Sequence, residues 1–311
     1  MLAFALAMAL AAHAGPLDSP SGRYAVTVVA VEQRGDIEET VLSFPSPVKS
    51  PWPANDTVYA HLVVKKGTKG APAVLVLPVM AAPNVWIETR FTERFARDGL
   101  AVMWLEMPTQ FRRRPDPSQP SGQVFLGRTT ASLARNYRQS ILDARRALDV
   151  LSARPEADPG RVALFGISLG ALVGSMVYSL DARPVFAVFL LGGADFPSLL
   201  MGSAMTGPFA RKLGLTVEDV RKAWPGMDPG ERRAQNAGKP VMLVNASWDA
   251  VIPKANALHL KDAFPDSTQI WVPGGHYSAI VHLAWLPGWA SKKLQDAFKA
   301  GKNTIKRPKT P

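Results

Sequence analysis

Short apolar runs separated by stretches of helical periodicity dominate the chain from residue 73 onwards. The runs are four to seven residues long and apolar at nearly every position. In chain order they are Ala73–Leu77, Ala101–Leu105, Val162–Phe165, Val185–Leu191, Val241–Val244 and Gln269–Val272. Strands that are apolar on both faces are typical of a parallel sheet covered by helices. The pattern therefore predicts that these runs are the central strands of such a sheet.

Helical periodicity is clearest in 131–152, where apolar residues recur every three or four positions and form one stripe. A helix N-terminus is indicated at Thr216–Asp219, with Leu215 and Val220 placed to pack against each other. Trp285–Lys299 is expected to form a closing helix. Strands and helices in alternation predict an α/β fold, with a mostly parallel sheet and helices on both of its faces.

The N-terminal part of the chain has a different pattern of residues. Tyr24–Val31, Val41–Phe44 and Thr57–Val64 are rich in β-branched residues and are predicted to be strands joined by turns. The first fourteen residues are apolar and uncharged and end in Ala12-His13-Ala14, a pattern typical of a signal-peptide cleavage site. Residues 1–14 are therefore predicted to be a signal peptide of an exported protein, periplasmic or extracellular. A short N-terminal core helix is the alternative, and the protein would then be cytoplasmic.

Composition removes several classes of protein. The 311 residues are 47% hydrophobic and 20% charged, which describes a globular chain, and there is no cysteine. Disulfides, zinc-thiolate sites and cysteine nucleophiles are thereby excluded. The net charge is +11, but the window 108–146 and the tail 292–311 each carry +6, which leaves the rest near neutrality. This distribution argues against a nucleic-acid partner. No later stretch has the ~18 consecutive apolar residues of a membrane span.

The most informative segment is Gly166-Ile167-Ser168-Leu169-Gly170. A predicted strand precedes it and a helix-compatible run, Ala171–Leu180, follows it. In a tight strand-to-helix turn the two glycines let the chains pass, and the serine hydroxyl is held up at the carboxyl end of the sheet. The Leu169 N–H, at the helix N-terminus, then points to where an oxyanion would form. The alternative is a glycine-rich turn whose serine only caps a helix.

Two further polar residues follow predicted strands. Asp249 lies on the loop after Val241–Val244, and His276 lies on the loop after Gln269–Val272. Because the carboxyl ends of parallel strands share one edge, Ser168, Asp249 and His276 are expected to meet there. Asp195, which follows Val185–Leu191, is the rival acid, but the turn ending at Pro253 favours Asp249. A surface-loop histidine is the alternative for His276.

These residues make the chain resemble the α/β-hydrolase superfamily over about residues 40–300. Within it, the chain looks most like the dienelactone-hydrolase-like, acetyl-esterase-like and prolyl-oligopeptidase-like catalytic domains. The resemblance rests on Gly166–Gly170, Asp249, Gly274-Gly275-His276 and the run from Arg138 to Arg161. It implies a single-domain α/β-hydrolase fold over 22–300, with 195–240 as a small cap insertion. Residues 301–311 are expected to be a basic flexible tail.

The resemblance also implies a mechanism. Ser168, His276 and Asp249 would cleave small or medium carboxylic esters through an acyl-enzyme, with no metal or cofactor. Family members commonly carry His-Gly after the third strand, where this chain has Leu77-Pro78-Val79-Met80, so by position Met80 would be the second oxyanion donor beside Leu169. A peptidase or acyltransferase with the same triad, and an inactive binding protein of this fold, are the alternatives. The sequence leaves the oligomeric state open.

Several residues are candidates for contact with substrate. Trp248, Tyr277 and Trp86 stand near predicted loop ends and could line the cleft. The proposed insertion is rich in Met and aromatic residues, which suit an apolar site or ordinary core packing. Arg112-Arg113-Arg114 follows the strand Ala101–Leu105 and could face an anionic substrate, with a solvated basic loop as the alternative.

Overall fold

The computed structural model of the chain describes residues 17, 23–81 and 83–304, with the backbone alone for 301–304. The predicted signal peptide and residues 305–311 of the predicted tail lie outside the described residues. In the described part of the chain, no helix combines the length and the apolar character needed to cross a bilayer.

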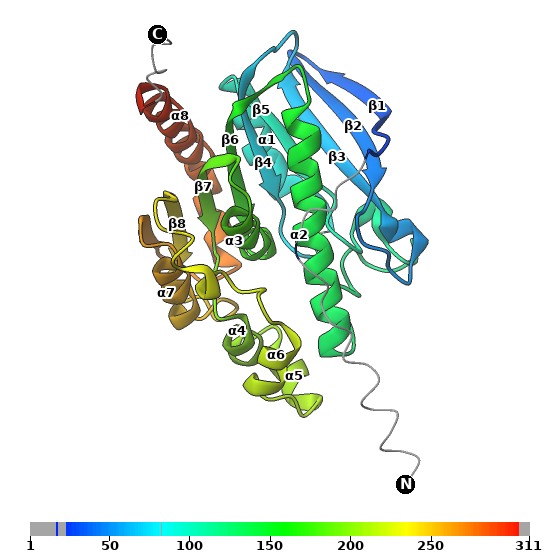
Figure 1. Ribbon diagram of the computed structural model, residues 1–311, viewed down its shortest axis with the longest axis vertical. Helices are drawn as coiled ribbons and strands as arrows, with labels where there is room; N and C mark the ends of the chain where they lie inside the picture. The colour runs from blue at the N-terminus through cyan, green and yellow to red at the C-terminus, as the bar shows by residue number, and fades with distance from the viewer. Residues whose placement is uncertain (1–16, 18–22, 82, 305–311) are drawn as a thin grey trace, which may run out of the picture.

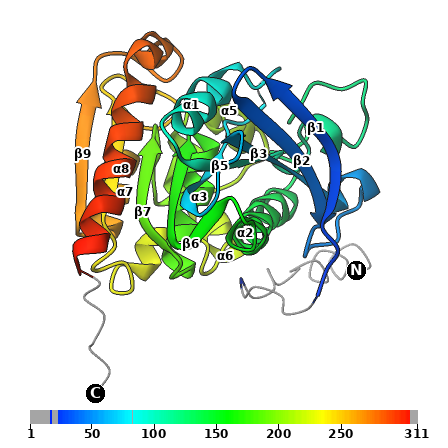
Figure 2. The ribbon, with the colours of Figure 1, turned by 90° about the horizontal axis from the view of Figure 1, so that it is seen from above.

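One sheet of nine strands, counted over the described residues, runs through the molecule in the order β1-β2-β3-β5-β4-β6-β7-β8-β9 (Figures 1 and 2). The pairings among β1, β2, β3 and β5 are antiparallel, and those from β5 to β9 are parallel. The strands are β1 Thr27–Arg34, β2 Ile37–Pro45, β3 Thr57–Lys65, β4 Ala71–Leu77, β5 Ala101–Leu105, β6 Ala157–Ile167, β7 Pro184–Leu190, β8 Val241–Ala246 and β9 Ser267–Val272. The six parallel strands coincide with the six apolar runs, so the predicted α/β class is confirmed.

Helices cover both faces of this sheet and build a separate core on each. The α-helices are α1 Trp86–Arg97, α2 Thr130–Ser152, α3 Leu169–Leu180, α4 Phe196–Gly202, α5 Gly207–Lys212, α6 Val217–Ala223, α7 Lys254–Ala263 and α8 Leu286–Thr304. Helices α1 and α8 bury residues such as Phe91 and Leu294 on one face. Helices α2 and α3 bury residues such as Ile141 and Val173 on the other. Burial on both faces explains why the central strands are apolar throughout.

The segment 195–240 leaves the layered part of the fold and forms α4, α5, α6 and the 3-10 turn η3, Pro229–Arg232. Figure 1 shows α4, α5 and α6 gathered beside one another, away from the sheet. The start of α6 follows the sequence: Thr216 Oγ1 accepts from the Asp219 N–H at 3.2 Å, and the Thr216 N–H donates to Asp219 at 2.9 Å. Leu215 and Val220 both join the core under this helix.

Three other short 3-10 turns connect the main elements: η1 Pro53–Asp56, η2 Phe111–Arg113 and η4 Ser278–Ala284. Two boundaries differ from expectation. Strand β1 is displaced towards the C-terminus relative to the predicted Tyr24–Val31. Helix α8 continues to Thr304, so the first four residues of the predicted flexible tail are helical.

Candidate active site at the carboxyl edge of the sheet

Ser168 sits in a strained turn between β6 and α3. Its backbone has φ 54° and ψ −115°, a conformation that few residues with a side chain adopt. The flanking glycines are required by space, because a Cβ at Gly170 would lie 1.9 Å from the Leu77 carbonyl oxygen. A Cβ at Gly166 would lie 2.3 Å from the Gly170 oxygen. The turn therefore holds the Ser168 side chain at the end of the central strands.

The structure brings the three predicted side chains together in one line. Ser168 Oγ lies 2.9 Å from His276 Nε2, and His276 Nδ1 lies 2.8 Å from Asp249 Oδ2. The side chains of His276 and Asp249 are only 8% and 3% exposed. Both hydrogen bonds are thus largely shielded from water, which strengthens them.

The loop after β8 fixes the Asp249 carboxylate. Its second oxygen, Oδ1, accepts from the backbone N–H groups of Val251 and Ile252, each at 2.8 Å. The Trp248 N–H donates to the Gly274 carbonyl at 2.9 Å and so ties this loop to the one that carries His276. Both oxygens of the acid are engaged, and the carboxylate has a single orientation towards the imidazole.

Asp195, the rival acid, has a different environment. It precedes α4 in a left-handed conformation, with φ 55°. Its carboxylate lies 3.7 Å from Arg221, a residue of the same insertion. His276 is therefore paired with Asp249, the acid that the turn ending at Pro253 favoured in the sequence.

The two residues predicted to supply oxyanion donors line the same cavity as Ser168 and His276. Leu169 is the first residue of α3, where an N–H has no partner within the helix. Met80 lies on the loop between β4 and α1. Both residues line the cavity, as the sequence interpretation requires of oxyanion donors.

The cavity has a volume of about 440 Å³ and is lined almost entirely by apolar side chains. They come from α2, α3, the 120–127 loop and the insertion, and include Phe125, Tyr137, Leu172, Phe196, Leu199 and Trp224. Of the Met and aromatic residues of the insertion, Phe196, Met205 and Trp224 line the cavity. The contribution of α2 and of the 120–127 loop was missed, because nothing in their sequence marks them as neighbours of Ser168.

Of the three predicted pocket residues, only Tyr277 lines this cavity. Trp248 and Trp86 do not line it, so these two predictions are wrong, and the residues are 74% and 49% exposed. Trp248 precedes Asp249, whose side chain is buried against His276. Trp86 opens α1 and lies under the guanidinium of Arg90 on the helix surface.

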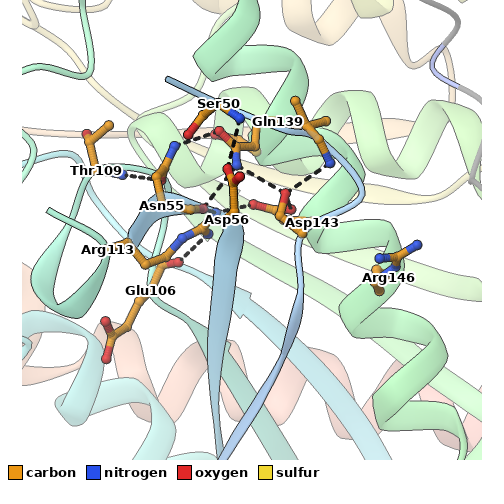
Figure 3. A network of polar contacts seen from close by, with 12 residues as sticks. Ser50, Asn55, Asp56, Glu106, Thr109, Arg113, Gln139, Asp143 and Arg146 are labelled. Atoms are coloured by element: carbon orange, nitrogen blue, oxygen red, sulfur yellow. Dashed lines mark hydrogen bonds and ion pairs between the residues drawn. The ribbon is translucent and has the colours of Figure 1, made fainter. Parts of the chain in front are cut away.

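Neither alternative for Arg112-Arg113-Arg114, a loop that faces substrate or a solvated basic loop, holds at Arg113. This side chain is fully buried and bonds to Asp143 at 2.6 Å, to the Asn55 carbonyl at 2.7 Å and to the Glu106 carbonyl at 2.9 Å (Figure 3). Asp143, on α2, lies in the run from Arg138 to Arg161, but no contact with Arg113 was predicted for it. Arg113 therefore joins η1, the end of β5 and α2, and faces neither solvent nor substrate.

Among the described residues, no group of three or more His, Asp or Glu side chains is arranged to hold a metal ion. The chemistry available at this edge of the sheet is that of a hydroxyl, an imidazole, a carboxylate and backbone N–H groups beside an apolar cavity.

Comparison with known proteins defines the fold. No family model matches the chain. The α/β-hydrolase domain-containing protein WAV2 of Arabidopsis thaliana is 27% identical over 179 residues, which cover 50% of this chain and 56% of that protein. The chain thus matches little more than half the length of this curated relative.

Several solved structures superpose over most of the chain. An acetyl xylan esterase from a Paenibacillus species has a TM-score of 0.62 at 18% identity and covers 91% of this chain and 93% of its own. Acetyl xylan esterase 1 of Thermoanaerobacterium has a TM-score of 0.63 at 16% identity, with 85% and 87% covered. A cold-adapted esterase from an Arctic intertidal metagenomic library has a TM-score of 0.61 at 16% identity, with 87% and 99% covered. The chain has the α/β-hydrolase fold in a single domain.

Proposed function

We propose that the protein is a serine carboxylesterase of the acetyl-esterase-like and dienelactone-hydrolase-like branch. One observation carries the proposal: the hydrogen-bonded line from Ser168 through His276 to Asp249 opens onto an apolar cavity. A hydroxyl, an imidazole and a carboxylate in this order form the machinery of acyl transfer on several unrelated folds.

In this proposal Ser168 Oγ attacks the ester carbonyl carbon while His276 Nε2 takes the hydroxyl proton. Asp249 accepts from the Nδ1–H, holds that tautomer and stabilises the imidazolium that forms. The tetrahedral intermediate collapses when His276 gives the proton to the alcohol oxygen, which leaves. Water, deprotonated by the same imidazole, then attacks the acyl-enzyme and releases the acid and free Ser168.

The negative charge of the tetrahedral intermediate needs donors that are already in place. We assign this role to the N–H groups of Leu169 and Met80, because both residues line the cavity beside Ser168. A single donor of this kind is typically worth about 3 kcal/mol of transition-state stabilisation.

The cavity supports an ester whose acyl group is apolar. Its volume of about 440 Å³ is ample for an acyl chain longer than acetyl, and its walls offer few hydrogen bonds. Tyr277 lines the cavity beside His276 and is 70% exposed, so the alcohol would depart on this solvent side. Each methylene buried in such a cavity contributes about 0.8 kcal/mol, or about fourfold in kcat/KM.

The test is Ser168→Ala, assayed on p-nitrophenyl acetate and p-nitrophenyl butyrate. Loss of the nucleophile should reduce kcat by about 10⁶-fold, to the background of the assay. Ser175→Ala is the matched control, because Ser175 is a buried serine of the same helix that bonds only to the Leu172 carbonyl. It should retain wild-type turnover.

A fluorophosphonate probe gives an independent readout. It should label the wild-type chain at Ser168 and leave Ser168→Ala unlabelled. Turnover retained by Ser168→Ala would refute the assignment of the nucleophile. A folded wild-type chain that neither labels nor cleaves any ester would refute the enzyme and favour a binding protein of this fold.

A further inference from the structure

Two buried side chains hold the residue that precedes Met80. The Val79 N–H donates to Glu88 Oε1 at 3.0 Å, and the Val79 carbonyl accepts from Gln110 Nε2 at 3.2 Å. Glu88 lies on α1 and is 1% exposed, whereas Gln110 lies on the loop after β5 and is 0% exposed. Both backbone groups of Val79 are thus bonded to side chains that come from distant parts of the sequence.

The bond to the Val79 carbonyl also sets the direction of the next N–H. The Val79–Met80 peptide is trans, and in a planar trans peptide the C=O and the N–H point in opposite directions. Because Gln110 holds the carbonyl on one side, the Met80 N–H must point to the other. Met80 lines the cavity that Ser168 and His276 share.

Gln110 is itself rigidly placed. Its N–H donates to the Met107 carbonyl at 3.1 Å, and its carbonyl accepts from the Arg113 N–H at 2.8 Å. The preceding N–H, of Thr109, donates to Asn55 Oδ1 at 2.9 Å, inside the buried network of Arg113 (Figure 3). The buried network around Arg113 thus anchors the loop that carries Gln110.

A second contact supports the loop of Met80 on its other side, at Ala81. Ala81, directly after Met80, has φ 58°, and Gly122 packs against it so closely that a Cβ would lie 2.8 Å from Ala81 Cα. The Gly122 N–H donates to the Thr109 carbonyl at 3.0 Å. Met80 is therefore held between two fixed neighbours.

Glu88 and Gln110 each bury a polar atom that has no partner in the described part of the chain, which is unfavourable for contacts that serve stability alone. Among the described residues, Glu88 Oε2 and Gln110 Oε1 are buried oxygens without a hydrogen-bond partner. A buried polar atom left unpaired destabilises the folded state, and an apolar side chain at either position would avoid that cost. Burial also raises the pKa of Glu88, with the Val79 N–H opposing the shift. Residues that break local packing rules in this way are expected where function requires them.

We propose that Glu88 and Gln110 are positioning residues that clamp Val79 and thereby aim the Met80 N–H at the oxyanion. The inference rests on the proposed esterase function and adds the two side chains that prepare one of its donors. Neither side chain lines the cavity, so neither is expected to touch substrate.

The decisive variants are Gln110→Met and Glu88→Leu, which preserve size and remove the hydrogen bonds to Val79. Each should lower kcat by about 10- to 100-fold, short of the loss expected when a donor is deleted, and leave KM within about threefold. Glu88→Gln keeps an oxygen that accepts from the Val79 N–H and should recover most of the wild-type kcat.

Two control variants remove buried polar groups that do not touch Val79. Thr92→Val lies on α1 with Glu88, where its hydroxyl bonds to the Thr89 carbonyl. Asn236→Leu removes a buried amide that bonds to the Pro229 and Ala263 carbonyls. Both should keep the wild-type kcat, whatever they cost in thermal stability.

Two inhibitors distinguish a loss of oxyanion positioning from general damage to the site. A trifluoromethyl ketone forms a tetrahedral oxyanion on Ser168, so its Ki should rise in proportion to the loss of kcat. Butyrate, a planar product, should bind equally well to wild type and variants. If Glu88→Leu does not fold, Gln110→Met and this pair of inhibitors carry the test.

Wild-type kcat in Gln110→Met, or equal weakening of both inhibitors, would overturn the clamp while leaving the esterase intact. A wild-type chain that cleaves no ester and binds no trifluoromethyl ketone would overturn the esterase and the clamp together.

Discussion

Two histidines of this protein are paired with carboxylates in different ways. His276 has Asp249 on one ring nitrogen and the hydroxyl of Ser168 on the other, at the wall of a cavity. His61, on β3, has a carboxylate on each nitrogen: Nδ1 lies 2.8 Å from Glu39, and Nε2 lies 3.3 Å from Glu106. Its ring is 6% exposed and stacks on Trp104 with centroids 3.8 Å apart.

The difference distinguishes His276, the base in the proposed mechanism, from His61, which two carboxylates favour as a cation. A carboxylate only accepts hydrogen bonds, so an imidazole between two of them is held as a donor on both sides and has no lone pair to offer. Burial opposes a charge on His61, but Glu106 and Glu39 outweigh it and raise the pKa of the ring. Nearness to an acid therefore does not make a histidine a base; the second nitrogen must face a proton donor that substrate can reach.

The largest effect is expected when one acid beside each histidine is replaced: Asp249 beside His276 and Glu106 beside His61. Asp249→Asn should reduce kcat by about 10⁴-fold, because the amide no longer fixes the tautomer of His276. Glu106→Gln removes a carboxylate from His61 and should leave kcat within about threefold, since no reacting atom depends on it. Ester hydrolysis by the two purified variants measures the difference.

Asp195→Asn is the control for the acid itself. Its contact with the half-exposed Arg221 is worth about 0–1 kcal/mol, and its loss should barely change turnover. A larger loss of rate in Asp195→Asn than in Asp249→Asn would identify Asp195 as the catalytic acid. The comparison between His276 and His61 would then no longer hold.

The next effect concerns stability, in the polar region that adjoins Glu106. Arg113→Met leaves Asp143 buried without its cation and should cost about 3–5 kcal/mol in the free energy of unfolding. Arg112→Met removes a 46% exposed partner of Glu106 and should cost less than about 1 kcal/mol. Urea denaturation of both variants measures the costs, and equal costs would contradict the buried role of Arg113.

The smallest effect is a dependence of stability on pH. The pKa of His61 is raised above its usual 6.5, so its contribution is complete below about pH 6.5 and is lost as the pH rises through the folded-state pKa. The pKa of Glu39 is lowered, chiefly by its hydrogen bond to His61, so that contribution is lost only as the pH falls through its own folded-state value.

His61→Gln should therefore flatten the decline in urea midpoint between about pH 6 and pH 9. His259→Gln is the control, because this histidine lies on the surface of α7. A wild-type midpoint that does not fall over this range would show that His61 is not the cation described above.

Much of the fold could be predicted because its signals are local. Runs that are apolar on both faces mark the parallel strands, and the glycines beside Ser168 mark a turn that no larger residue fits. The placement of Asp249 and His276 after successive strands needs only the rule that parallel strands end at one edge. Helix α1 was not predicted, because its buried face consists of few residues, such as Phe91 and Phe95, among many charged ones.

What could not be predicted depends on partners far away in the chain. Arg113 resembles its neighbours Arg112 and Arg114 in sequence, and only the approach of Asp143 and Asn55 makes it a core residue. Trp248 and Asp249 are neighbours in sequence, and only the contact of Asp249 with His276 distinguishes the buried side chain from the exposed one. The clamp on Val79 joins α1 to the loop after β5, and neither segment carries a motif.

The absence of a side chain at Gly170 has a consequence for how this protein could diverge. Helix α3 meets the end of β4 backbone against backbone, next to Leu77 and Pro78, so the turn that carries Ser168 directly adjoins the loop that carries Met80. The insertion lines the cavity but takes no part in this junction. If the protein is the esterase proposed above, changes in the insertion would alter which acyl chains are admitted and leave the reaction centre unchanged, so selectivity and chemistry could evolve separately.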